Sequence, residues 1–91
     1  MGQRERKLLV VDDDDAFRTV LSLELKRRGF AVTSAATGEA ALTAFSEAEP
    51  SVVLLDLRLP DMDGLEVLAR MRKHSTNAEI IMLTGHGTID T

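Results

Sequence analysis

The sequence predicts a doubly wound α/β fold, in which a parallel sheet carries helices on both faces. Four short apolar runs alternate along the chain with three helix-like segments, and this alternation is typical of parallel sheets. Three of the runs, 7–11, 51–57 and 79–83, consist mainly of consecutive apolar residues, as in strands that are covered on both sides. We therefore expect one domain of 91 residues with the strand order 2-1-3-4.

The first half of the chain shows a strand, a helix and a weaker strand. Residues 7–11 are rich in Val and Leu. The segment 15–30 is amphipathic, and its apolar stripe comprises Phe17, Val20, Leu21 and Leu25. Basic residues in its last turn suit the helix dipole, and Gly29 is expected to end the helix. Residues 31–36 form a second, weaker strand candidate.

The second half continues the alternation of helices and strands. A helix is expected at 39–48, after a Thr-Gly turn, and Pro50 ends it. The strand at 51–57 is the clearest in the chain, and a loop marked by Pro and Gly follows it. The helix at 65–74 is expected to bury a stripe formed by Leu65, Leu68 and either Met71 or Arg72. The last predicted strand is 79–83.

Composition excludes several classes of function. The formal net charge of −4 disfavours direct binding of nucleic acid, which requires a basic surface. The absence of cysteine excludes disulfides and thiolate zinc sites, and it fits a reducing cytoplasm. No apolar run approaches the ~20 residues of a membrane span. We expect a cytoplasmic protein whose direct partner is neither a membrane nor nucleic acid.

Oxygen-bearing side chains follow three of the four strands. Asp12 and Asp13 follow the first strand, Asp56 ends the third and Thr84 follows the fourth. Ligands of open parallel sheets bind at the carboxyl ends of the strands, so these side chains should share one crevice if the first and third strands are neighbours. Carboxylate oxygens without thiolates suit Mg²⁺, which would also make the clustered negative charge tolerable.

A purely structural interpretation of the aspartates stays open at this point. Asp14 and Asp15 need no metal, because at the start of a helix they can cap backbone N–H groups and interact favourably with the dipole. Asp12 and Asp13 could also be cap and turn residues. Asp56 fits that interpretation less well, since it ends a buried strand, whereas Thr84 alone indicates little.

Three segments resemble the signature segments of the receiver domains of bacterial two-component response regulators, the CheY-like fold. They are "LLVVDDDDAFR", "VVLLDLRLPDMDGLEVL" and "EIIMLTGHG". The resemblance covers essentially the whole chain, and the combination of strand–Asp–Asp, strand–Asp-x-x-x-Pro-x-x-x-Gly and strand–Thr in this order is specific to the family. The segments look most like the receivers of NtrC-type transcriptional activators or of hybrid sensor kinases.

The resemblance implies a role for five residues. Asp56 corresponds to the phosphoacceptor, and Asp12 and Asp13 to the acidic pair that holds Mg²⁺ directly or through water. Arg58 corresponds to the position whose backbone carbonyl completes the metal site, and Thr84 to the hydroxyl that responds to phosphorylation. The implied protein is no classical enzyme but a phosphoacceptor that at most catalyses its own phosphorylation and dephosphorylation. Its implied partners are a sensor histidine kinase or phosphotransfer protein, and an output domain.

The sequence also departs from the family, whose members have about five strands and five helices. It ends at Thr91, where a fourth helix would begin, so we interpret 1–91 as an incomplete receiver domain without the last strand and helices. The family's lysine on the fifth strand has no counterpart among Lys7, Lys26 and Lys73. We therefore expect impaired phosphorylation, and self-association through the exposed fourth strand or an uncovered sheet face.

Two other functions are compatible with parts of the sequence. Haloacid-dehalogenase-like phosphatases place a nucleophilic aspartate and a second acid after their first strand, and Asp12 and Asp14 have that spacing. Ala16, however, stands where that family has Thr or Val. The other alternative is a fragment without chemistry that only associates with a partner.

Overall fold

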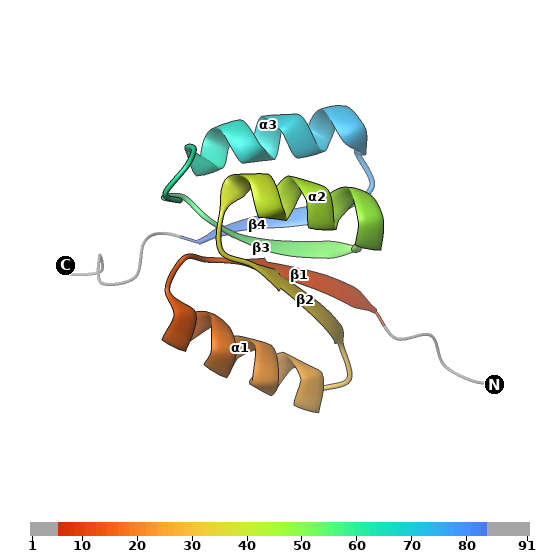
Figure 1. Ribbon diagram of the computed structural model, residues 1–91. Helices are drawn as coiled ribbons and strands as arrows, with labels where there is room; N and C mark the ends of the chain where they lie inside the picture. The colour runs from red at the N-terminus through yellow and green to blue at the C-terminus, as the bar shows by residue number, and fades with distance from the viewer. Residues whose placement is uncertain (1–5, 84–91) are drawn as a thin grey trace.

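The computed structural model describes residues 6–83 as a parallel four-stranded sheet with helices on both faces. The strand order is β2-β1-β3-β4 and every neighbouring pair is parallel, which confirms the predicted topology. Figure 1 shows α1 on one face and α2 and α3 on the other. In chain order the elements are β1 (Lys7–Val11), α1 (Asp15–Arg27), β2 (Ala31–Ala35), α2 (Gly38–Ala48), β3 (Val52–Asp56), α3 (Gly64–His74) and β4 (Glu79–Leu83).

Local capping explains where α1 begins and ends. The Asp14 side chain accepts a hydrogen bond of 3.0 Å from the Phe17 N–H, and Asp15 lies in the first turn, as the sequence predicts. Gly29 adopts a positive φ of 100° just after the helix, a conformation that costs glycine little. None of the helices among residues 6–83 is long and apolar enough to cross a membrane.

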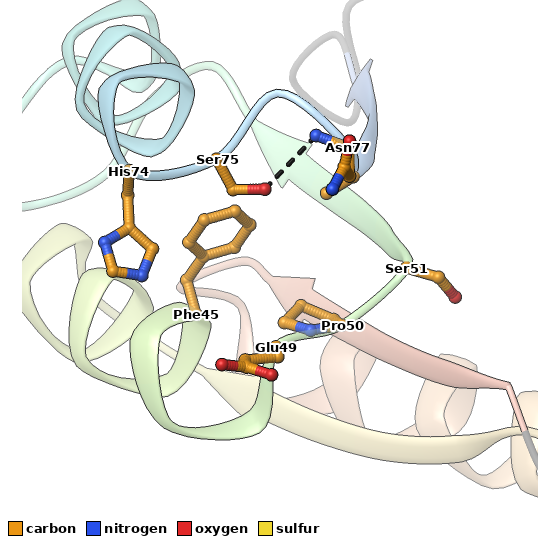
Figure 2. A pocket seen from close by; sticks show the side chains of 8 residues that line it. Phe45, Glu49, Pro50, Ser51, His74, Ser75 and Asn77 are labelled. Atoms are coloured by element: carbon orange, nitrogen blue, oxygen red, sulfur yellow. Dashed lines mark hydrogen bonds between the residues drawn. The ribbon is translucent and has the colours of Figure 1, made fainter.

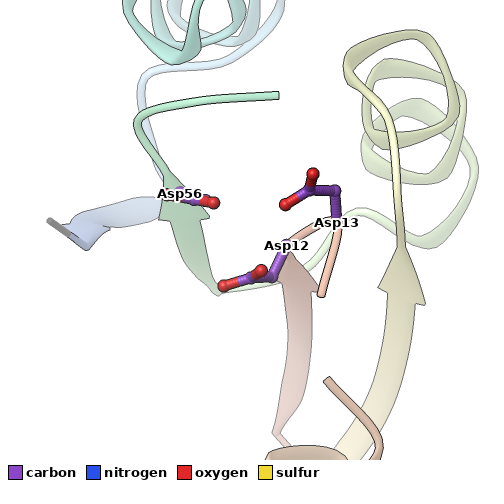
Figure 3. A group of neighbouring side chains, drawn as sticks. All are labelled: Asp12, Asp13 and Asp56. Carbon is purple, nitrogen blue, oxygen red and sulfur yellow. The ribbon is translucent and has the colours of Figure 1, made fainter. Parts of the chain in front are cut away.

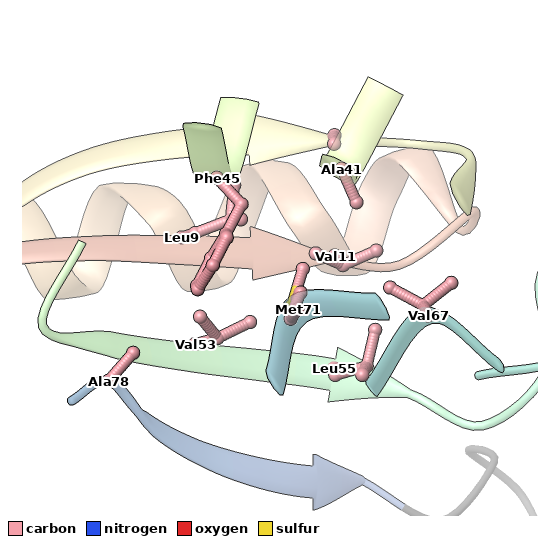
Figure 4. Close-up of a cluster of buried hydrophobic side chains, with 10 residues drawn as sticks. Leu9, Val11, Ala41, Phe45, Val53, Leu55, Val67, Met71 and Ala78 are labelled. Atoms are coloured by element: carbon pink, nitrogen blue, oxygen red, sulfur yellow. The ribbon is translucent and has the colours of Figure 1, made fainter. Parts of the chain in front are cut away.

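The main core lies between the sheet and the α2–α3 layer. Alternate residues of β1 and β3 point to this face and meet one side of each helix (Figure 4). The fully or almost fully buried members are Leu9, Val11, Ala35, Ala41, Phe45, Val53, Leu55, Val67, Met71 and Ala78. The core is aliphatic except for Phe45, and it fixes the positions of the carboxyl ends of β1 and β3.

The predicted buried stripe of α3 is partly wrong. Of the predicted residues, Met71 is completely buried and Leu68 is half-buried, but Leu65 is 57% exposed. Val67, which was not predicted, is completely buried. The reason lies at the start of the helix, where Gly64 packs against the backbone of Asp56 and Leu57. This contact sets the rotation of α3, so that positions 64, 67 and 71 face the sheet and Leu65 turns to solvent.

The other face of the sheet is only partly covered within residues 6–83. Helix α1 packs over β1 and β2 and buries Leu8 and Val10. The predicted stripe of α1 is less buried than its pattern indicates, since Val20 is 67% exposed and no residue of the helix is fully buried. On the same face Ile81 of β4 is 45% exposed. An apolar surface therefore remains beside α1 over β3 and β4.

Candidate functional site

Three carboxylates meet at the carboxyl ends of the two central strands. Asp12 and Asp13 follow β1, and Asp56 ends β3, which pairs directly with β1. The side chains project toward a common region (Figure 3), and one carboxylate oxygen from each lies within 4.8 Å of the others. The predicted convergence of these three residues is thus present.

The three acids differ in their exposure to water. Asp12 is fully buried, Asp56 is 2% exposed and Asp13 is exposed. Buried carboxylates in close proximity repel each other strongly because little water screens them. A bound cation would compensate this charge, and three hard oxygen donors, one of them open to solvent, fit a Mg²⁺ ion that keeps part of its water shell.

Hydrogen bonds of both its backbone and its side chain hold Asp12 in place. Its N–H donates to the Ala35 carbonyl of β2 at 3.1 Å, and its Oδ1 accepts from the Asp14 N–H at 2.9 Å. The Arg18 guanidinium donates to the Asp12 carbonyl at 2.8 Å and also pairs with Asp15 at 2.7 Å. Sequence reasoning missed Arg18, although its spacing of three residues from Asp15 on a helix is a signal for such a pair.

Of the other predicted site residues, one can be placed. The Arg58 N–H donates a long hydrogen bond of 3.4 Å to Asp56 Oδ1, so the backbone of Arg58 lies next to the predicted phosphoacceptor. Arg58 also forms an isolated antiparallel bridge with Asp63, which closes the loop between β3 and α3. Thr84 lies outside the described residues. Asp14 serves as the N-cap of α1, which gives it a structural role apart from the three-carboxylate cluster.

Sequence reasoning also missed Asp61, in the loop between β3 and α3. Its carboxylate accepts hydrogen bonds from the N–H groups of Gly38 at 2.7 Å and Glu39 at 2.9 Å, at the start of α2. These two donors, first Gly38 and then Glu39, hold the pKa of Asp61 below its ordinary value of 3.8. No local pattern could reveal this contact, because the partners are 23 and 22 residues apart.

A cavity of about 440 Å³ lies at the opposite end of the sheet, between the ends of α2 and α3 (Figure 2). The rings of Phe45 and His74 meet there edge to face, with centroids 5.8 Å apart. The Ser75 hydroxyl accepts a hydrogen bond of 3.1 Å from the Asn77 N–H, which orders the turn before β4. This cavity is remote from the three carboxylates and has a different chemical character.

The strand order 2-1-3-4, with a cluster of three aspartates at the carboxyl ends of β1 and β3, defines a CheY-like α/β domain. Residues 8–91 match the sequence profile of the response regulator receiver domain, and the chain belongs to that family.

Individual relatives agree with this assignment. The chain is 39% identical over 85 residues to the regulatory protein AtoC of Escherichia coli (strain K12), which covers 93% of this chain and 18% of AtoC. The crystal structure of response regulator protein TrrA from Thermotoga maritima, in complex with Mg²⁺–BeF, matches with a TM-score of 0.82 and 38% identity over 90% of this chain and 71% of TrrA. NtrX from Brucella abortus, an NtrC-type activator, matches with a TM-score of 0.85 and 31% identity over 94% of this chain and 20% of NtrX.

The chain spans between 18% and 68% of the length of the curated relatives that it matches. Receiver domains bind Mg²⁺ at an acidic pocket and interact with histidine kinases or phosphotransfer proteins in two-component systems. They are not classical enzymes, although they can take a phosphoryl group from small donors without a kinase. The match to this family, together with the capping role of Asp14, speaks against the phosphatase alternative.

Proposed function

We propose that this chain is the phosphoacceptor module of a two-component phosphorelay and that it takes a phosphoryl group on Asp56 with the help of Mg²⁺. The observation that carries this proposal is the convergence of three carboxylates, two of them buried, at the ends of adjacent strands. A binding module without chemistry would have no need of such a costly arrangement. The Mg²⁺–BeF complex of TrrA supports the same combination of metal and acceptor.

In this proposal Asp12, Asp13, Asp56 and the backbone carbonyl of Arg58 hold the metal. When bound, the Mg²⁺ ion neutralises charge on the transferring phosphoryl oxygens. An Asp56 carboxylate oxygen forms a bond to phosphorus as the bond from phosphorus to the donor nitrogen or oxygen breaks, and the donor atom keeps that electron pair. The product is an acyl phosphate. Asp12 and Asp13 orient the reactants.

The rate of this reaction should be low for residues 1–91 alone. The three lysines of the chain, Lys7, Lys26 and Lys73, start β1 or lie in the last turns of α1 and α3. These positions are all at the end of the sheet opposite the carboxylates. None of the three lysines can therefore contact a phosphoryl group on Asp56. A phosphoryl-transfer site that lacks a lysine contact of this kind can lose a few kcal/mol of transition-state stabilisation. We include Thr84 in the proposal as the hydroxyl that responds to the new phosphoryl group.

The remaining parts of the proposal concern the setting of the module. The phosphoryl donor is a sensor histidine kinase or a phosphotransfer protein, and the readout is an output domain whose identity the receiver does not define. The cytoplasm is the compartment, in keeping with the family and with the absence of cysteine. Neither nucleic acid nor a membrane is the direct partner of the receiver itself.

Intact-mass measurement tests the proposal. The chain is incubated with acetyl phosphate, with and without Mg²⁺, and its mass is followed over time. We expect a slow, Mg²⁺-dependent gain of one phosphoryl group that hydroxylamine removes, because acyl phosphates react with this nucleophile. The gain should be absent in Asp56→Asn and present in Asp15→Asn, a matched surface control. A gain that persists in Asp56→Asn would refute the assignment.

A further inference from the structure

The loop between β3 and α3, residues 57–63, is tightly closed on itself. The Gly64 N–H donates to the Leu57 carbonyl at 2.8 Å, and Arg58 bridges to Asp63 across the loop. A side chain at Gly64 would overlap the carbonyl oxygen of Asp56, so the end of the loop lies directly against the predicted phosphoacceptor. Whatever holds this loop in place therefore also holds the backbone beside Asp56.

Asp61 anchors the loop to a different element. Both of its carboxylate oxygens accept backbone hydrogen bonds, from Gly38 at 2.7 Å and from Glu39 at 2.9 Å, in the first turn of α2. The N-cap residue of α2, Thr37, accepts from the next donor, the Ala40 N–H, at 3.0 Å. Two side chains thus satisfy three N–H groups of the first turn, and the helix dipole favours the charge of Asp61.

A second contact secures the same junction. The Met62 side chain lies so close to Gly38 that a Cβ atom at position 38 would overlap it. Met62 is also partly buried against the main core. The loop therefore meets α2 through a charged cap at Asp61 and an apolar contact at Met62.

This junction connects two loops that contact the residues of the three-carboxylate cluster. The first is the β2–α2 connection, and the β2 residue just before it, Ala35, accepts the hydrogen bond from the Asp12 N–H. The second is the β3–α3 loop, where Arg58 lies three residues before Asp61. Two contacts therefore restrain the backbone of Arg58. One is its own hydrogen bond to Asp56, and the other is the attachment of the same loop to α2 through Asp61.

We propose that Asp61 is a positioning residue of the acceptor site: by anchoring the β3–α3 loop to α2, it holds the Arg58 carbonyl where the metal needs it. This inference rests on the proposed function, since it concerns the same metal site. Asp61 touches neither the metal nor the phosphoryl group. Its effect passes through the backbone of the loop, as in metal sites whose outer groups orient the ligands.

The test compares Asp61→Ala with Thr37→Ala. Both substitutions remove a side-chain cap from the first turn of α2, but only the first releases the β3–α3 loop. Mg²⁺ affinity is measured by titration calorimetry on the 91-residue chain. We expect an approximately 10-fold weaker affinity in Asp61→Ala and an unchanged affinity in Thr37→Ala. Asp61→Asn, which retains one acceptor oxygen in the same volume, should lie between, and it serves if Asp61→Ala does not fold.

Hydrogen exchange of the Gly64 amide gives a readout without metal. Its bond to the Leu57 carbonyl closes the loop, so exchange should accelerate in Asp61→Ala and not in Thr37→Ala. Equal effects of the two substitutions on affinity and exchange would overturn the proposal, because Asp61 would then act only through helix stability. Wild-type affinity in Asp61→Ala would also overturn it. If Mg²⁺ binds equally well to Asp13→Asn and to the wild type, the proposed metal site itself has failed, and the positioning role fails with it.

Discussion

Asp12 and Asp13 are adjacent in the chain but lie in different environments. Asp12 is fully buried and is fixed by the Ala35 carbonyl and the Asp14 amide, whereas Asp13 is exposed to solvent. The next two aspartates serve α1, as its N-cap and as the partner of Arg18. The run of four acids therefore divides between a candidate metal site and the start of a helix. Two of the four charges are stabilised by the start of α1, and only the other two need a cation.

This division predicts different effects of two similar substitutions. Asp13→Ala removes a proposed Mg²⁺ ligand and should weaken Mg²⁺ binding by at least about 10-fold. Asp15→Ala removes an ion pair with Arg18 in which the Asp15 side chain is 84% exposed, and it should leave binding nearly unchanged. Calorimetric titration of both variants with Mg²⁺ checks this. Equal losses of affinity would mean that general negative charge, and not the pair Asp12 and Asp13, attracts the cation.

The pKa of Asp61 predicts a pH dependence of stability. Because the pKa is lowered in the folded state, the unfolded chain binds more protons near pH 3.8, and the stabilisation by Asp61 is lost as the pH falls through the folded-state pKa. Urea unfolding should show the wild type to be more stable than Asp61→Asn at pH 7 and at pH 5, with a smaller difference at pH 3. A difference that is the same at all three pH values would contradict the ionised cap.

The residues of the site were predictable to different degrees. Asp12, Asp13 and Asp56 could be predicted because the carboxyl ends of neighbouring parallel strands meet, a rule that needs only the strand order. Asp61 could not, because its contact with Gly38 depends on how a loop packs on a helix that is distant in sequence. Arg58 was predicted from family resemblance, and its placement beside Asp56 depends on the closed loop.

At the scale of elements, the register of α3 shows how a loop sets the rotation of a helix. The predicted stripe of Leu65, Leu68 and either Met71 or Arg72 fitted the apolar pattern of the segment, and its Met71 alternative agrees with the structure. The contact of Gly64 with the end of β3 sets another rotation, in which Val67 and Met71 face the core. Sequence periodicity predicts that a helix is amphipathic, but a close backbone contact of this kind has no periodic signal.

This register predicts the cost of two truncations in the same helix. Met71→Ala should lower the free energy of unfolding by about 2–5 kcal/mol, because it opens a cavity in the main core. Leu65→Ala should cost about 0.5 kcal/mol or less, since the side chain is 57% exposed. Urea unfolding at pH 7 measures both values. Comparable losses for the two variants would mean that Leu65 is buried, as the sequence predicts, and would contradict this register of α3.

For the whole molecule, the predicted topology is confirmed, and the two faces of the sheet differ. One face is closed by α2 and α3, whereas the other carries only α1 within residues 6–83. The alternation of strands and helices predicts that helices lie on both faces. It does not specify how completely each face is covered. The exposure of Val20 and Ile81 could therefore be determined only from the structure.

As a separate polypeptide, the 91-residue chain should self-associate. Within the described residues β4 pairs on one side only, and Ile81 leaves an apolar surface beside that edge. Free strand edges and apolar surfaces favour pairing with a second copy. Sedimentation velocity should show a mass above one chain at micromolar concentration. Ile81→Lys should shift the distribution toward the monomer. Leu65→Lys is the control: it adds the same charge on α3, away from the β4 surface, and should leave the distribution unchanged. A monomer at all concentrations, with cooperative unfolding, would contradict this prediction.

The position of the acyl phosphate tests the central claim most directly. The chain is treated with acetyl phosphate and Mg²⁺ and then reduced with borohydride, which converts a phosphorylated aspartate to homoserine, and the peptides are sequenced by mass spectrometry. The account predicts homoserine at position 56 and none in Asp56→Asn. Homoserine at position 12, the nucleophile of the phosphatase alternative, would contradict it.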